Sequence, residues 1–139
     1  MKTDRGWLFW VLVVAAATSA ANAAWMLAAP AQWYRDLPAG VPDTGPYNEH
    51  FVRDIGTAFA TMAVALFWAA FAPRWRTPLV AIATLFVVAH AGLHVFDTAR
   101  GFLEADHWWL DAPGVYLPAL VLAPIALRLL RASRTATPR

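Results

Sequence analysis

Four long apolar runs constrain the fold of this chain more than any other feature. They cover residues of about 7–29, 49–71, 78–98 and 113–130. Each is close to the roughly 20 residues that an α-helix needs to cross a hydrocarbon core of about 30 Å. Only 14% of the 139 residues are charged, against about 25% in an average soluble domain. We therefore expect an all-α, integral membrane four-helix bundle with up-down topology, forming one transmembrane domain over residues 1–139.

The first apolar run resembles a secretory signal peptide in outline. Lys2 and Arg5 precede it, and small residues follow around Ala23, where a signal peptidase would cut. The run is longer than a usual signal core, so we interpret it as an uncleaved first helix. Asn22 is its only amide, and we expect this side chain to form an interhelical hydrogen bond.

The segments between the runs differ in character. Residues 30–47 hold four prolines and two glycines, which predicts an outer loop without regular helix. Asn48 is a suitable N-cap for the second helix. Residues 100–112 carry Trp108 and Trp109 among several charged residues, which indicates an interfacial segment. Residues 131–139 are polar and basic and are predicted to be disordered.

The distribution of charge predicts the orientation. With the N-terminus in the cytoplasm, eight of the eleven basic residues fall inside, which follows the positive-inside rule. Those eight are Lys2, Arg5, Arg74, Arg76, Arg128, Arg131, Arg134 and Arg139. All the acidic residues except Asp4, and all four histidines, then gather at the outer end. We expect both termini to be cytoplasmic, in the inner membrane of a bacterium.

Two polar stripes mark the outer halves of the second and third helices. His90, His94 and Asp97 recur at i, i+4 and i+7, so they lie on one side of a helix. His50 and Asp54 form a similar stripe near the start of the preceding helix. Because the two helices run in opposite directions, both stripes reach the same level and we expect them to face each other. Ionisable side chains in a membrane span indicate a functional site.

Imidazole and carboxylate groups in this pattern suit a transition metal ion, with zinc, copper and iron as the candidates. The predicted ligands are His50, His90, His94 and Asp54. Four further residues are expected to orient the ligands or to form ion pairs: Glu49, Arg53, Asp97 and Arg100. For Arg53 two interpretations stay open: a functional role at the site, or an ion pair with Asp54 or Asp97 that holds the two helices in register.

Other functions fit the same residues. A haem could be held between His50 and either His90 or His94. The histidines and acids could form a proton relay or pH sensor, or a structural network in an accessory or assembly subunit of a membrane complex.

The predicted partners are the lipid bilayer and another membrane protein or a second copy of the chain. A stand-alone enzyme is disfavoured, because there is no cysteine and no serine near the stripes. Nucleic-acid binding is excluded, because topology explains the basic residues.

Two short sequences are distinctive, namely His-Phe-Val-Arg-Asp-Ile-Gly over residues 50–56 and the pair His90 and His94. Together with the four-helix plan and the proline-rich outer loop, they resemble small uncharacterised bacterial membrane proteins and, in architecture, DoxX-type four-helix proteins. The abundance of alanine and arginine, with a single lysine, is typical of a bacterium with a high-GC genome. The resemblance implies the fold and implies no residue roles.

Overall fold

The computed structural model describes residues 6–135, and in this part of the chain all regular secondary structure is helical, with no strand. The long helices are α1 (Trp7–Ala28), α3 (Glu49–Phe71), α4 (Arg76–Ala99) and α6 (Leu117–Thr135). The connections contain α2 (Pro30–Asp36), the 3-10 helices η1 (Val41–Thr44) and η2 (Pro73–Trp75), the short helix α5 (His107–Leu110) and the π-helical turn η3 (Ala112–Tyr116). The predicted all-α fold with four long apolar helices is confirmed.

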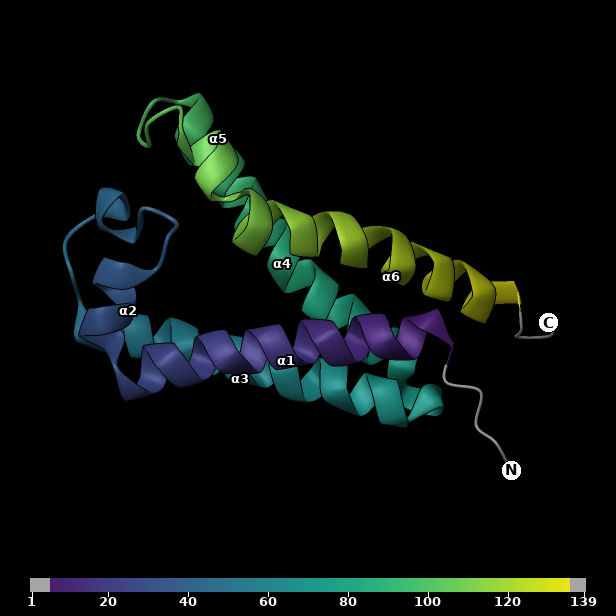
Figure 1. The fold of residues 1–139 in the computed structure, drawn as a ribbon. Helices are drawn as coiled ribbons and strands as arrows, with labels where there is room; N and C mark the ends of the chain where they lie inside the picture. The colour runs from purple at the N-terminus through teal and green to yellow at the C-terminus, as the bar shows by residue number, and fades with distance from the viewer. Residues whose placement is uncertain (1–5, 136–139) are drawn as a thin grey trace.

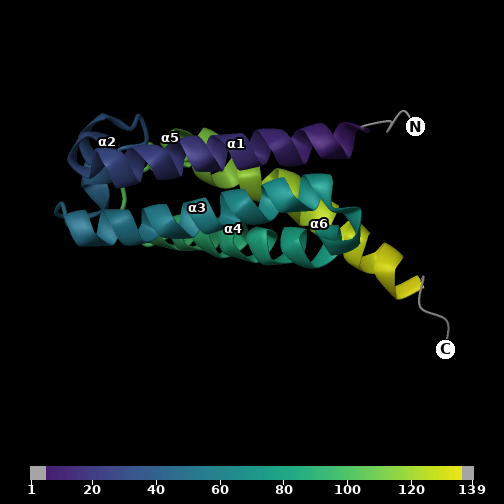
Figure 2. The same cartoon turned by 90° about the horizontal axis from the view of Figure 1, so that it is seen from below.

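The long helices alternate in direction, so the connections gather at two ends of the molecule (Figures 1 and 2). One end carries α2, η1, α5 and the start of α3, and we call it the loop end. The other carries η2 and both ends of the described chain, and we call it the terminal end. Lys2, Asp4, Arg5 and Arg139, which entered the charge argument, lie outside the described residues.

The helices associate as two pairs. α1 packs most extensively on α3, α4 packs on α6, and the α3–α4 hairpin joins the pairs. In Figure 1, α4 diverges from the α1–α3 pair toward the loop end. A contact between η1 and α5, described below, connects the two pairs there.

The apolar core lies mostly on the terminal side of the molecule. Its fully buried side chains include Leu12, Leu66, Val80 and Leu122, one from each long helix. Toward the loop end, Gly56 allows α3 to approach α1, because a Cβ there would lie 3.0 Å from the Met26 Cβ. Small residues permit such close approach between membrane helices.

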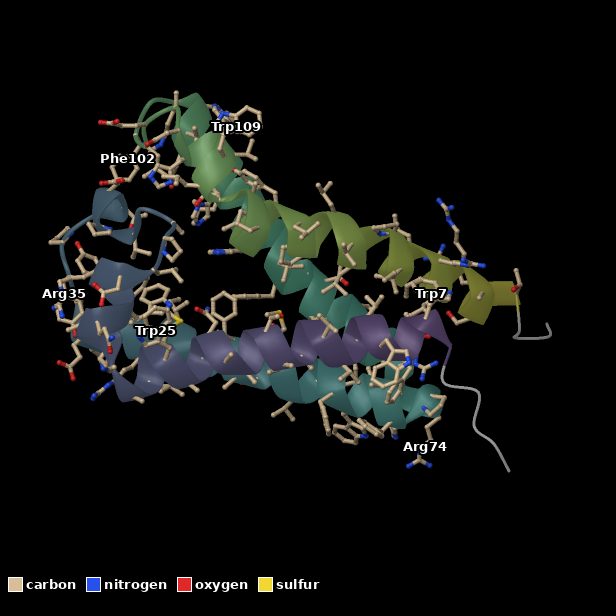
Figure 3. The ribbon with its side chains drawn as sticks, viewed as in Figure 1. Trp7, Trp25, Arg35, Arg74, Phe102 and Trp109 are labelled. Carbon is tan, nitrogen blue, oxygen red and sulfur yellow. The ribbon has the colours of Figure 1, made fainter. Side chains whose placement is uncertain are left out.

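The outward faces of the long helices are also apolar. Val64, Ile82, Leu85 and Leu120 are each about two-thirds exposed or more, which suits contact with lipid. Within residues 6–135, four helical stretches are long and apolar enough to cross a membrane: Trp7–Ala28, Glu49–Phe71, Pro73–Ala99 and Ala112–Thr135. Trp25 and Trp109 lie at the loop end and Trp7 at the terminal end (Figure 3), as in the aromatic belts of membrane proteins.

The outer loop departs from prediction, because residues 30–47 contain α2 and η1. The prolines do not prevent these helices, since Pro30 and Pro42 lie in their first turns, where the missing N–H needs no partner. The Asn22 prediction is confirmed: Trp33 of α2 donates its indole N–H to Asn22 Oδ1 at 2.8 Å. The cap prediction is also confirmed, because the Phe51 N–H donates to Asn48 Oδ1.

The ends of two helices also differ from prediction. α4 begins at Arg76 rather than near residue 78, because Pro78 falls in its first turn. α6 continues to Thr135, so the prediction of disorder over residues 131–139 is wrong for 131–135, and 136–139 lie outside the described residues. The segment 100–112 is confirmed as a connection that adds no further span, since α5 has only four residues.

Candidate functional site

Four side chains at the loop end form a connected group, which we call the His/Asp network: Asp43, His94, His107 and Asp111. Asp111 Oδ2 lies 2.8 Å from His94 Nδ1 and 3.3 Å from His107 Nδ1. His107 Nε2 in turn lies 3.3 Å from Asp43 Oδ2. The bond to His94 is short for an N–H···O hydrogen bond, and the other two lie just beyond the usual range of about 2.7–3.2 Å. A single carboxylate oxygen therefore connects two imidazole rings.

Burial within the network decreases toward the water. His107 and Asp111 are 0% and 1% exposed, whereas the Asp43 side chain is 55% exposed. Charged groups are almost never so deeply buried unless they are paired. Asp111 Oδ1 is also buried, and no hydrogen-bond partner for it lies in the part of the chain that the structure describes. Asp111 Oδ1 can therefore accept a hydrogen bond from a further donor.

Several local features bring the network together. His94 lies in the last turns of α4, and Asp111 lies between α5 and the π-helical turn η3. The backbone carbonyl of Asp111 accepts hydrogen bonds from Val115 N and Tyr116 N, which starts the π-helical turn. The carboxylate of the same residue contacts the imidazole rings of His94 and His107. Such π-helical turns are frequent at functional sites.

Gly40 allows the loop that contains η1 to lie close to His107. Its φ is +59°, in the left-handed region, which glycine adopts without steric cost. A Cβ at this position would lie 2.8 Å from Asp43 Oδ2 and 3.1 Å from His107 Nε2. A side chain at residue 40 would therefore separate the two groups that connect η1 to α5.

His90 and His94, two of the predicted ligands, lie together. Their ring centroids are 4.7 Å apart, in an edge-to-face arrangement. His90 also stacks on Phe86, with 5.9 Å between centroids and an interplanar angle of 5°, and its ring lies nearly perpendicular to that of Phe59 of α3, with 6.1 Å between centroids. His90 is thus set in an aromatic environment, and His94 connects it to the His/Asp network.

His50 and Asp54, the other predicted ligands, pair with each other instead. His50 Nε2 lies 3.3 Å from Asp54 Oδ2, and the two side chains are 89% and 59% exposed. The structure shows no contact between this pair and His90 or His94. Helical periodicity therefore placed His50 and Asp54 on a common face, but that face points to the surface.

The expected orienting residues form local ion pairs. Arg53 binds Glu49 at 3.0 Å, so the interpretation that Arg53 pairs with Asp54 or Asp97 is wrong. The reason is geometric, since Glu49 lies one turn away on the same helix. Asp97 binds Arg100, three residues along, at 2.9 Å. Neither pair connects α3 with α4.

Three members of the network, namely Asp43, His107 and Asp111, were not predicted as site residues. His94 is the one member that was predicted. Asp43, His107 and Asp111 lie in the two connections between long helices, where the periodicity of the long helices gives no signal. The usable signals were the left-handed tendency of Gly40 near Asp43 and the spacing of His107 and Asp111, which are four residues apart in an apolar, tryptophan-rich segment.

Comparison of the chain with protein-family models, with curated proteins and with solved structures finds no match. The resemblance to DoxX-type proteins thus stays a prediction. The same holds for metal and haem binding. Among residues 6–135, no group of three or more His, Asp or Glu side chains is arranged to hold a metal ion. What the geometry offers chemically is a set of hydrogen-bonded acids and bases that leads from the surface to a buried carboxylate.

Proposed function

We propose that this chain is a small polytopic membrane protein whose His/Asp network carries protons between the water outside the membrane and the interior of the helical bundle. The observation that carries this proposal is the position of Asp111 Oδ2, within hydrogen-bonding reach of His94 Nδ1 and His107 Nδ1. Histidine can both donate and accept a proton near neutral pH, and buried chains of Asp and His serve as proton relays in membrane proteins.

The proposed path starts at Asp43, which contacts water, and continues through His107 and Asp111 to His94. Every ring nitrogen of His107 faces a carboxylate oxygen, so a proton that arrives at one nitrogen can leave from the other. Tyr116 and His90 also interact electrostatically with Asp111, and His90 contacts His94.

The path ends inside the bundle. Beyond His90, the buried side chains of α4 toward the terminal end are Val87, Thr84, Ala83 and Val80, none of which titrates. No continuous route to the terminal end is therefore present in the described residues. This supports an accessory subunit that exchanges protons with a partner in a membrane complex, in preference to a transporter that works alone.

We further propose that the four apolar helices cross the inner membrane of a bacterium, with the loop end outside and both termini in the cytoplasm. The described basic residues of the terminal end support this orientation: Arg74, Arg76, Arg128, Arg131 and Arg134. Single cysteines at Asp36 and Ala132, in a chain that has none of its own, should react with a membrane-impermeant thiol reagent from opposite sides. Labelling from the same side would contradict the topology.

Infrared difference spectroscopy on the protein in lipid nanodiscs tests the relay. A step in external pH should change the carboxylate band of Asp111, which D111N identifies by its loss. Asp43→Asn removes the group at the water end, so the response of Asp111 should be lost or strongly slowed. Asp54→Asn is the matched control, because the Asp54 carboxylate pairs with the exposed His50 outside the network, and it should respond as the wild type does. An equal response in Asp43→Asn would contradict the proposed path.

Elemental analysis separates the relay from the metal site predicted from sequence. The protein would be purified in mild detergent without a chelator or a histidine tag. The relay predicts no stoichiometric transition metal. A near-stoichiometric ion that is lost in His90→Ala and His94→Ala would overturn the relay and support metal binding.

A further inference from the structure

A groove on the lipid-facing side of the α1–α3 pair lies outside the His/Asp network. It has a volume of about 630 Å³, and its walls are almost entirely apolar. Small side chains of α1, including Ala17 and Ala20, form one wall, and Phe67, Trp68 and Phe71 of α3 form the other. The three aromatic side chains are each about half exposed, so they project beyond the helix surface.

The groove leads to a cationic group at the terminal end. Trp68, in its wall, lies 6.4 Å from Trp75 between ring centroids, and the Arg74 guanidinium lies 5.3 Å above the Trp75 ring. No ion pair of Arg74 is found among residues 6–135. Arg76, its neighbour, is already occupied, since it donates hydrogen bonds to the carbonyls of Ala69 and Ala70. Arg74 lies at the end of the α1–α3 pair in Figure 3.

We propose that this groove binds one acyl chain of an anionic phospholipid whose headgroup phosphate pairs with Arg74. Charge complementarity supports this occupant, because an unpaired guanidinium at the membrane boundary attracts anionic headgroups. The shape of the groove also favours an acyl chain over a helix. Close approach of membrane helices is favoured by small residues at the contact, and the projecting aromatic wall of α3 would hold a second helix away from the small residues of α1.

Native mass spectrometry of the full-length protein provides the test. The protein in mild detergent would be incubated with equal amounts of phosphatidylglycerol and phosphatidylcholine that carry the same acyl chains. We expect one bound phospholipid, with phosphatidylglycerol preferred about fivefold, as one arginine near the membrane surface predicts. Arg74→Gln should abolish the preference and retain binding, whereas Ala17→Leu should fill the groove and abolish binding of both lipids.

Two variants serve as matched controls. Arg131→Gln removes an exposed charge at the same end, and Ala21→Leu enlarges an exposed residue of α1 that does not line the groove. Both should bind lipid as the wild type does, and circular dichroism should show that all variants are folded. Equal retention of the two lipids by the wild type, or unchanged binding in Ala17→Leu, would overturn the proposal. So would a wild-type dimer that Ala17→Leu dissociates, because a second copy would then occupy the groove.

Discussion

The loop end contains two groups of histidine and acidic side chains with the same chemistry in opposite settings. On α3, His50 and Asp54 pair across one helical turn in contact with solvent. In the His/Asp network, His107 and Asp111 also lie one turn apart, but both are buried and are connected to His94 and Asp43 from other segments. An exposed local pair contributes little to stability, whereas a buried pair that loses one partner leaves an uncompensated polar group. The comparison shows that the surroundings of such a pair, rather than its spacing, determine its importance.

Substitution of Asp111 should have the largest effect on stability. Asp111→Ala leaves two imidazole Nδ1 atoms without their shared acceptor in a buried site, so we expect the free energy of unfolding to fall by about 3 kcal/mol. Unfolding by sodium dodecyl sulfate in mixed micelles, followed by circular dichroism, measures this change. A loss as small as that of a surface substitution would show that the network does not differ from the α3 pair.

Substitution of Gly40 should have an intermediate effect. Gly40→Ala combines a left-handed backbone with crowding against Asp43 and His107, and we expect a loss of about 2–3 kcal/mol. Gly101→Ala is the matched control, because Gly101 also has a positive φ, of +75°, but a Cβ there would meet no atom within 4 Å. It should cost about 1 kcal/mol. The same unfolding assay compares the two variants, and equal losses would mean that the contact between η1 and α5 adds nothing.

The smallest effect is expected on α3. His50→Ala and Asp54→Ala should each change the free energy of unfolding by no more than about 0.5 kcal/mol, since their pair is exposed. The coupling energy that the double variant reveals should likewise be no more than about 0.5 kcal/mol, because the pair is exposed. A loss of more than 1 kcal/mol in either single variant, on the scale of a buried contact, would show that this pair has a partner beyond α3.

The sequence alone was sufficient for the long helices and insufficient for the site. Apolar runs of membrane-spanning length and a side-chain cap such as Asn48 are local features, so they predict α1, α3, α4 and α6 directly. The His90–His94 contact is also local. Asp43 and His107, in contrast, are 64 residues apart. Their contact depends on how α4 diverges from α3 and on the fit of Gly40, and neither follows from periodicity.

The most direct test of the connected network is ¹⁵N NMR of the histidine side chains in nanodiscs. If Asp111 connects His94 and His107, the Nδ1 signals of both rings should shift in Asp111→Asn, and Asp43→Asn should change the signals of His107 and, through Asp111, of His94, with His50 unaffected. A change confined to His107 in Asp43→Asn, with the signals of His94 unchanged, would contradict a relay from the surface to the bundle interior.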